Sequence, residues 1–324
     1  MSLKRVVACI KRNKRFLITT HTNPEGDALG SELAFYRLLK AMGKDAVMIN
    51  DDAIADSYAF LPGINDIQRF VKSAKDIKFD CFVILDCSDL GRAGEVQRLN
   101  KLAKPILNID HHISNLRFGQ INWIETNVSS TSEMVYQLYK KLGIPFDREV
   151  ATDLYVGILT DTGSFHYANT SAATHKAVAE LLKYGLDIPR IYQHIYEDIP
   201  FVDACLLSKI FPTLKRRFSG RVTWFALRRS LLKKYKGLSF DLTEHVLSFA
   251  RAVKDVEVAL LFKENLGVKN EIRINFRSKG KVDVNKIAQF FGGGGHKTAS
   301  GCTVKGGIEE IRRRVLAKIK ESLR

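Results

Sequence analysis

Residues 21–27 place three potential metal ligands, His21, Glu25 and Asp27, in one short stretch of the chain. A proline and a glycine in the same stretch predict a loop, which follows an apolar run and precedes a helical pattern. Imidazole and carboxylate side chains together suit Mn²⁺ and similar divalent ions. For this segment alone a structural interpretation is equally open, because Asp27 would also serve as the N-cap of the following helix.

Three further clusters of ionisable residues follow in the first half of the chain. Each is expected at the end of a predicted strand: Asp86, then Asp110 with His111 and His112, then Asp161. A carboxylate at the end of a buried strand needs a cation or hydrogen bonds to offset its lost hydration. One cluster alone would be compatible with an ordinary loop. Four clusters at the strand ends of one sheet indicate a shared site.

The elements that would position these residues alternate between short apolar runs and amphipathic stretches, which is typical of a parallel α/β sheet. The expected strands cover residues 15–22, 79–87 and 105–112. The expected helices cover about 27–42, 130–142, 147–160 and 170–184. In open α/β sheets ligands collect beyond the carboxyl ends of the strands, so one edge of the sheet is expected to gather the four clusters.

This mixture of ligands suits the hydrolysis of a phosphate ester. The reaction needs an activated water and neutralisation of the developing charge, and two divalent ions about 4 Å apart supply both. Carboxylate and imidazole ligands together favour Mn²⁺, with Mg²⁺ as a less favoured substitute once histidines take part.

Five segments resemble the motifs of the DHH phosphoesterases that carry a DHHA1 domain, in the order and at spacings that fit that family. The first four are HTNPEGDALGS (21–31), VILDCSD (83–89), NIDHHISN (108–115) and GILTDTGSF (157–165). The fifth is GGGGHKTASG (292–301), which RINFRS (273–278) precedes. The resemblance covers nearly the whole chain. It implies a metal-dependent phosphoesterase with an α/β fold: an N-terminal DHH domain with a mainly parallel sheet flanked by helices, linked to a smaller α/β DHHA1 domain.

The resemblance also implies roles for individual residues. The ligands of two Mn²⁺ ions would be His21, Glu25 and Asp86 for one, and Asp27, Asp86, His111 and Asp161 for the other. Asp86 would therefore bridge the two ions. The expected catalytic residues are His112, facing the scissile phosphate, and Asp110, orienting the imidazoles from behind the metals.

Glu25 departs from the family pattern, which usually has aspartate at this position. Glutamate can also bind a metal, but its additional methylene shifts the carboxylate oxygens by about one C–C bond. The geometry and affinity of the first metal position are therefore expected to differ from the family pattern.

Contacts to the substrate are expected in the second half, where the resemblance implies a grip on the terminal phosphate and base. The residues concerned are Arg277, Ser278, Gly293, Gly294, Gly295 and His296. Glycines let backbone N–H groups approach an anion, and arginine can bind a phosphate through two nitrogens. A P-loop does not fit, because His296 stands where that motif needs glycine and the run follows a helix. A flexible glycine linker is the simpler alternative.

The distribution of charge also favours an anionic substrate. Residues 1–200 carry 24 basic and 24 acidic side chains, whereas residues 201–324 carry 27 and 11, so the net charge of +16 lies in the last third. A basic run is often only a solvated surface. However, a neutral half rich in carboxylates joined to a basic half suits a polyanion that one half holds and the other cuts.

Two domains are expected, because 324 residues exceed one ordinary core. The expected bounds are 1–186 for the DHH catalytic domain, 187–206 for a linker and 207–324 for the DHHA1 substrate-binding domain. In the second domain the expected elements are strands at 220–227, 256–265 and 268–278, a short strand after the glycine run, and helices at 284–291 and 309–320.

In size and layout the chain is similar to bacterial nanoRNase/pAp-phosphatase proteins and to stand-alone phosphodiesterases of cyclic di-AMP. This similarity implies hydrolysis of RNA dinucleotides to mononucleotides, of pAp to AMP, or of both, with cyclic di-AMP or linear pApA as alternative substrates. RecJ-like exonucleases carry additional segments, and polyphosphatases usually have another C-terminal domain. The alternative from a different class is a non-catalytic nucleotide or RNA binder, which would have lost ligands that this chain retains.

Other features predict a protein of the reducing cytoplasm. The five cysteines form no CxxC pair, so neither a disulfide framework nor a thiolate zinc site is indicated. No apolar run approaches the roughly 20 residues of a membrane helix, and the basic N-terminus is unlike a secretory signal. No membrane partner is therefore expected. A homodimer is expected from the family resemblance alone.

Overall fold

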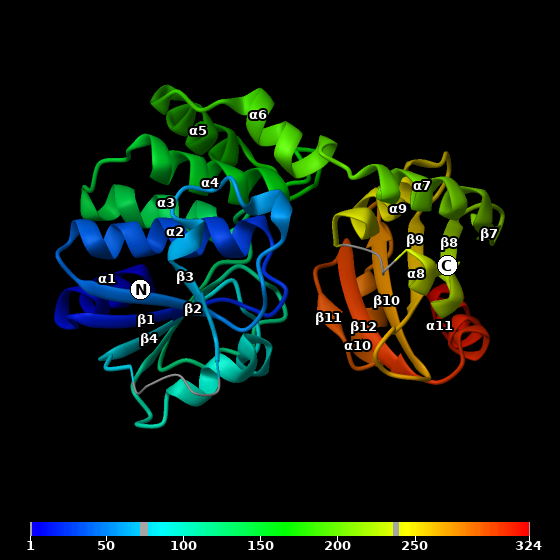
Figure 1. Cartoon of the computed structure of the whole chain (residues 1–324), viewed down its shortest axis with the longest axis horizontal. Helices are drawn as coiled ribbons and strands as arrows, with labels where there is room; N and C mark the ends of the chain where they lie inside the picture. Colours follow the sequence, from blue (N-terminus) through cyan, green and yellow to red (C-terminus); the bar gives the residue numbers. More distant parts are fainter. Residues whose placement is uncertain (1, 72–76, 236–239, 324) are drawn as a thin grey trace. The chain divides into compact units, whose positions relative to one another are not determined.

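The computed structural model describes residues 2–71, 77–235 and 240–323. The chain divides into two compact units, Met1–Glu197 and Asp198–Arg324, each built around its own sheet (Figure 1). The division falls inside the range predicted as a linker, residues 187–206. Most of that range is helical: α6 (Ile188–Tyr192), a π-helical turn (Gln193–Glu197) and the start of α7 (Phe201–Ile210).

The first unit contains a six-stranded sheet in the order β3-β2-β1-β4-β5-β6, with every neighbouring pair parallel. Its strands are β1 (Arg15–Thr19), β2 (Asp45–Asn50), β3 (Ile67–Arg69), β4 (Cys81–Leu85), β5 (Ile106–Asp110) and β6 (Ile121–Ile124). The three strands predicted from the sequence, β1, β4 and β5, are consecutive neighbours in this sheet. β4 and β5 are buried throughout, as their continuous apolar runs predict. The predicted α/β class is confirmed.

Helices cover one face of this sheet, where α2, α3 and α4 pack on one another (Figure 1). The α-helices of the unit before the linker range are α1 (Ser2–Arg12), α2 (Gly26–Ala41), α3 (Thr131–Leu142), α4 (Arg148–Asp161) and α5 (Ala172–Leu181). The 3₁₀ segments are Asp56–Tyr58, Ile64–Asp66, Leu90–Leu99 and Leu182–Tyr184. Side chains of β1 pack on both faces of the sheet. Phe16 and Ile18 belong to the core under the helices, whereas Leu17 packs in the opposite core with Ala93 and Val96 of the 3₁₀ segment Leu90–Leu99.

The second unit contains a smaller mixed sheet in the order β11-β12-β10-β9-β8-β7. Its strands are β7 (Lys215–Arg217), β8 (Val222–Leu227), β9 (Val258–Glu264), β10 (Glu271–Ser278), β11 (Gly294–Gly295) and β12 (Ala299–Lys305). Only the β8–β9 pair is parallel among the pairs described. The helices are α7, α8 (Arg229–Lys234), α9 (Phe240–Ala252), α10 (Val284–Phe290) and α11 (Ile308–Ser322), with a 3₁₀ turn at Phe211–Thr213. The two faces have separate cores.

Several elements are absent from the sequence-based prediction. They include α1, β2, β3, β6, β7, α8 and α9, as well as α6 and α7 in and beyond the linker range and the two-residue β11. β3 and β7 lie at sheet edges and have only three residues each, too few to produce a recognisable alternation of polar and apolar positions. In the described part of the chain, no helix combines the length and the apolar character needed to cross a membrane.

The contact between α2 and α4 depends on Gly30. A Cβ atom placed on Gly30 would lie 2.2 Å from the backbone oxygen of Asp153 on α4. Since that oxygen belongs to the backbone, a larger residue would have to separate the two helices. The glycine therefore sets the distance between the helix that carries Asp27 and the helix that ends at Asp161.

We predict that Gly30→Ala destabilises the first unit by about 1–3 kcal/mol or more, because overpacking between α2 and α4 outweighs the gain of about 1 kcal/mol from alanine's helix propensity. Urea unfolding followed by circular dichroism measures the change. Gly267→Ala is the control, since its new methyl group would meet nothing closer than 3.6 Å. A Gly30→Ala protein as stable as the parent would contradict the close contact.

Candidate active site

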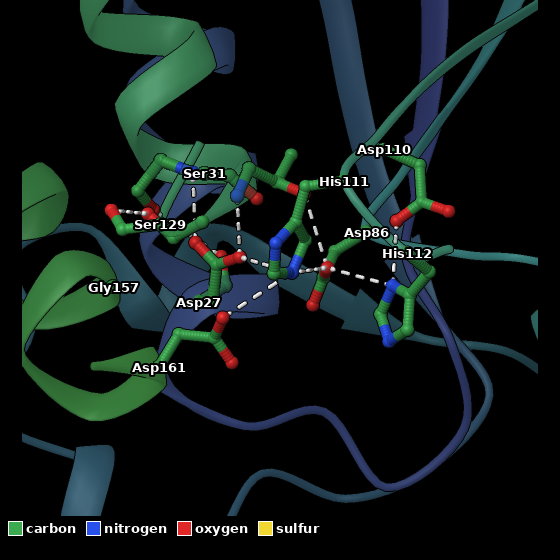
Figure 2. A network of polar contacts seen from close by, with 12 residues as sticks. Asp27, Ser31, Asp86, Asp110, His111, His112, Ser129, Gly157 and Asp161 are labelled. Atoms are coloured by element: carbon green, nitrogen blue, oxygen red, sulfur yellow. Dashed lines mark hydrogen bonds and ion pairs between the residues drawn. The ribbon is translucent and has the colours of Figure 1, made fainter. Parts of the chain in front are cut away.

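The loops after β1, β4 and β5 bring most of the predicted residues to one edge of the parallel sheet. His21 lies two residues after β1, Asp86 follows β4 directly, and Asp110 is the last residue of β5, with His111 and His112 next. Because these three strands are parallel neighbours, their carboxyl ends meet. Figure 2 shows the resulting polar network.

Asp161 reaches the same edge by a different route from the one predicted. The sequence predicts that Asp161 follows a strand. In the structure it is the last residue of the helix α4. The segment before it is helical because Asp147 caps its start and its apolar residues are buried against α2, α3 and α5. The carboxyl end of this helix therefore supplies the fourth cluster.

Three carboxylates surround the imidazole of His111 (Figure 2). His111 Nε2 lies 3.8 Å from Asp27 Oδ2, 3.6 Å from Asp86 Oδ1 and 3.3 Å from Asp161 Oδ2. One potential ligand atom from each of Asp27, Asp86 and His111 falls within a 4.8 Å span. The structure therefore brings together four of the predicted ligands around one point.

Asp27 does not cap its helix. The N-cap of α2 is Glu25, and Asp27 lies in the first turn, where both of its carboxylate oxygens face α3. Oδ2 accepts the backbone N–H of Thr131 at 2.6 Å, and Oδ1 accepts that of Ser132 at 2.8 Å. Burial, with the charges of Asp86 and Asp161, nevertheless raises the pKa of Asp27 well above its usual range.

Asp86 occupies a conformation that non-glycine residues rarely adopt, with a φ angle of 52°. Its Oδ2 atom lies 3.5 Å from His21 Nε2. Burial alone would raise the pKa of Asp86, but the hydrogen bond from His21 and the charges of His112 and His111 hold it below its usual range. Backbone strain at this position points to a side chain whose direction matters.

His21 and Glu25 differ in their position. His21 is 5% exposed, and its Nδ1 atom lies 2.8 Å from the backbone oxygen of Thr22. Since a carbonyl can only accept, Nδ1 carries a proton, and Nε2 is the nitrogen that faces Asp86. Glu25 is exposed at the start of α2 and belongs to none of the potential ligand groups found in the described residues. Its role as a ligand stays a prediction.

His112 is paired with Asp110 (Figure 2). His112 Nδ1 lies 2.7 Å from Asp110 Oδ1, and Asn115 Nδ2 donates to Asp110 Oδ2 at 2.6 Å. Burial alone would lower the pKa of His112, but Asp110 and Asp86 raise it to about 9. The imidazole is therefore protonated at neutral pH in the metal-free protein, and Asp110 keeps its charge with a pKa of about 2.

The residues at the start of α3 belong to none of the predicted site clusters. Ser129, Ser130, Thr131 and Ser132 are fully buried. Ser130 Oγ accepts the backbone N–H of Glu133, and Glu133 Oε2 accepts from Ser129. A serine three residues before a glutamate is a recognised signal for the start of a helix, and it could have located this helix end. It could not have indicated that the helix end faces Asp27.

The donors around His111 fit a divalent cation that accepts both oxygen and nitrogen ligands. Asp27 and Asp86, which are buried, and the half-buried Asp161 place like charges together, an arrangement that a cation stabilises. Imidazole and carboxylate donors match Mn²⁺ better than Mg²⁺. A second group of potential ligand atoms, from Asp86, Asp110 and His112, shares Asp86 with the first group.

In the second unit, Arg277 is held by a residue that lies outside all of the sequence motifs. Its guanidinium group forms a two-nitrogen ion pair with Glu244 of α9. Ser278, the next residue, is 2% exposed and donates to the backbone oxygen of Lys297 at 3.4 Å. Arg277 and Ser278 therefore lie beside the chain that follows the glycine run.

The glycine run forms a tight, ordered turn. Gly292 and Gly295 have φ angles of 76° and 139°, and a Cβ atom on Gly293 would lie 2.1 Å from the backbone oxygen of Gly301. Gly294 and Gly295 form β11 against β12, and His296 N donates to the oxygen of Ala299 at 2.7 Å. The alternative of a flexible linker is therefore wrong.

Comparisons with known proteins match both units. The model of the DHH family, N-terminal domain, matches residues 15–158, and that of the DHHA1 domain matches residues 231–324. A Thermus thermophilus protein named bifunctional oligoribonuclease and PAP phosphatase NrnA is 32% identical over 308 residues, covering 94% of this chain and 89% of that protein.

Two further relatives span nearly the same length. A Bacillus subtilis protein of the same name is 27% identical, covering 89% of this chain and 88% of its own. The crystal structure of an exopolyphosphatase-related protein from Bacteroides fragilis superposes with a TM-score of 0.87 at 26% identity, covering 99% of this chain and 95% of its own. The similarity therefore extends over both units.

We predict that Asp110→Asn lowers the pKa of His112 from about 9, because the effect of burial is then opposed by Asp86 alone. Titration of the imidazole signals by NMR in the metal-free protein measures the shift. Asp89→Asn is the control, since that side chain accepts only from Gly91 among the contacts described. An unchanged His112 would show that Asp110 does not set its charge.

Proposed function

The chain belongs to the DHH family of phosphoesterases, and we propose that it is a metal-dependent hydrolase of very short RNA oligonucleotides and of pAp. The observation that carries this proposal is the group of three carboxylates around His111, adjoining the His112–Asp110 pair, at one edge of the parallel sheet. The names of the relatives from Thermus thermophilus and Bacillus subtilis support the choice of substrate.

We propose two Mn²⁺ ions as the cofactor, held by the residues that meet at this edge. Asp27, His111 and Asp161 would hold one ion, His21 the other, and Asp86 both, with Glu25 as an additional ligand of the second. When bound, the ions would activate a water and neutralise charge on the phosphate. Asp86 suits the shared position because its two oxygens face different imidazoles, Oδ2 toward His21 and Oδ1 toward His111.

His112 would act on the substrate directly. Its imidazolium ring offers a positive charge and, through Nε2, a proton on the side away from Asp110. A phosphate oxygen that gains charge as the ester bond breaks is stabilised by such a donor. Asp110 would keep the ring oriented and charged, and Asn115 would fix Asp110 in turn.

The second unit would hold the end of the substrate. Arg277 is proposed to bind a terminal phosphate, together with His296 and the backbone of Gly293, Gly294 and Gly295. Ser278 would contribute through the loop it supports, because its side chain is buried. The ion pair with Glu244 means that a phosphate would have to share the guanidinium group with a carboxylate. Cyclic di-AMP and pApA remain the competing substrates.

We predict that Asp86→Asn reduces Mn²⁺-dependent hydrolysis of an RNA dinucleotide by roughly a thousandfold or more, since both ions would lose a ligand and several kcal/mol of stabilisation. The measurement is kcat of metal-stripped enzyme at graded Mn²⁺ concentrations. Asp89→Asn, three residues along the chain, is the control. Undiminished activity of the metal-stripped parent would rule out the metal mechanism.

We predict that Arg277→Ala raises KM for dinucleotides and pAp by about 10- to 100-fold with little change in kcat, because it removes a charged contact and leaves the metal ligands intact. Arg273→Ala on the same strand is the control. The measurement uses RNAs of two, five and twenty nucleotides, pAp and cyclic di-AMP at several salt concentrations. Fastest cleavage of the longest RNA with a steep salt dependence would contradict the proposed substrate class.

A further inference from the structure

Thr131, the first residue of α3, contacts two of the clustered carboxylates through two different groups. Its backbone N–H donates to Asp27 Oδ2 at 2.6 Å, and its hydroxyl Oγ1 donates to Asp86 Oδ1 at 3.1 Å. The residue is fully buried. A buried hydroxyl that donates to a carboxylate fixes that carboxylate more firmly than a solvent contact would. None of the motifs identified from the sequence includes this residue.

The orientation of the Asp86 carboxylate needs such a contact. The terminal torsion of an aspartate side chain is broad, so the backbone alone does not decide where each oxygen points. In the structure Oδ2 lies 3.5 Å from His21 Nε2, whereas Oδ1 lies 3.6 Å from both His111 Nε2 and His112 Nδ1. The hydroxyl of Thr131 donates to Oδ1 only. It therefore distinguishes the two oxygens.

We propose that Thr131 is a positioning residue for the bridging carboxylate. By holding Oδ1 on the side of His111, its hydroxyl directs Oδ2 toward His21, so that the two oxygens would be available to different divalent cations. This inference rests on the proposed two-metal function. It assigns a role to a residue that would contact the ligand Asp86 and neither the metals nor the substrate. Outer contacts of this kind typically change metal affinity or activity by about 10- to 100-fold when they are removed.

The surroundings of Thr131 hold it in place. Ser130 caps α3, and Glu133 Oε2 accepts from the Ser129 hydroxyl at 2.5 Å and from Thr174 Oγ1 at 2.9 Å. Asn169 Nδ2 donates to the backbone oxygens of both Ser129 and Asp161. The start of α3 is thus tied to α5 and to the end of α4. A hydroxyl on so fixed a backbone can define the direction of its acceptor.

The test compares three substitutions of Thr131. Thr131→Val keeps the side-chain shape and removes the hydroxyl, Thr131→Ser keeps the hydroxyl, and Thr131→Ala removes both hydroxyl and methyl. All three keep the backbone N–H that serves Asp27. Thr152→Val on α4 is the matched control, since its hydroxyl donates to the oxygen of Arg148 and not to the cluster. Calorimetric titration of each metal-free protein with MnCl₂ gives the number of ions bound and their affinities.

We expect Thr131→Val to weaken binding of at least one Mn²⁺ ion by about tenfold or more, and Thr131→Ser to stay within about threefold of the parent. Thermal unfolding of the metal-free proteins checks that Thr131→Val remains folded. A Thr131→Val protein with the affinities of the parent would overturn the inference. Should it not fold, the hydroxyl is isolated by comparing Thr131→Ala with Thr131→Ser, and equal affinities in these two would overturn it.

Asp86→Asn, titrated alongside, separates this inference from the proposed function. If Asp86→Asn loses Mn²⁺ binding while Thr131→Val retains it, the metal site stands and only the positioning role is wrong. If Asp86→Asn binds Mn²⁺ as the parent does, the proposed metal site itself is wrong, and the role of Thr131 with it.

Discussion

Repulsion among buried carboxylates is the constraint around which the first unit is arranged. Asp27 and Asp86 are buried and Asp161 is half-buried where they approach one imidazole, so their charges would repel one another. Two backbone N–H groups of α3 compensate Asp27, and histidines compensate Asp86. Burial still raises the pKa values of Asp27 and Asp161. The arrangement therefore favours a bound cation, which would neutralise the remaining charge.

The helices above the sheet approach closely beside these carboxylates. A Cβ atom on Gly157 of α4 would lie 1.9 Å from Ser132 Oγ and 2.9 Å from Asp27 Oδ1. Glycine here and at position 30 lets α2, α3 and α4 bring their ends to a common point. The site therefore includes groups from helix ends as well as from strand ends. These are N–H donors from α3 and the carboxylate of Asp161 from α4.

In the second unit, an ion pair and a rigid glycine turn define the candidate substrate-binding residues. Its glycines adopt backbone conformations or close contacts that larger residues would disturb, which holds the segment after them beside Arg277 and Ser278. Glu244 neutralises the Arg277 guanidinium in the absence of substrate. The candidate phosphate-binding arginine of this basic unit is thus already paired with a carboxylate. An anion would have to compete with that carboxylate in order to bind the guanidinium group.

The sequence by itself determined the α/β class, the central strands β1, β4 and β5, and the grouping of His21, Asp86 and Asp110 at strand ends, because continuous apolar runs and turn residues are local signals. It assigned Asp161 to a strand end, although the helix predicted at about 147–160 ends directly before this residue. It missed α3's role, Glu244 and Thr131 altogether. These depend on which helix end or strand lies opposite a given carboxylate, and residues more than 30 positions apart acquire that relation only through tertiary packing.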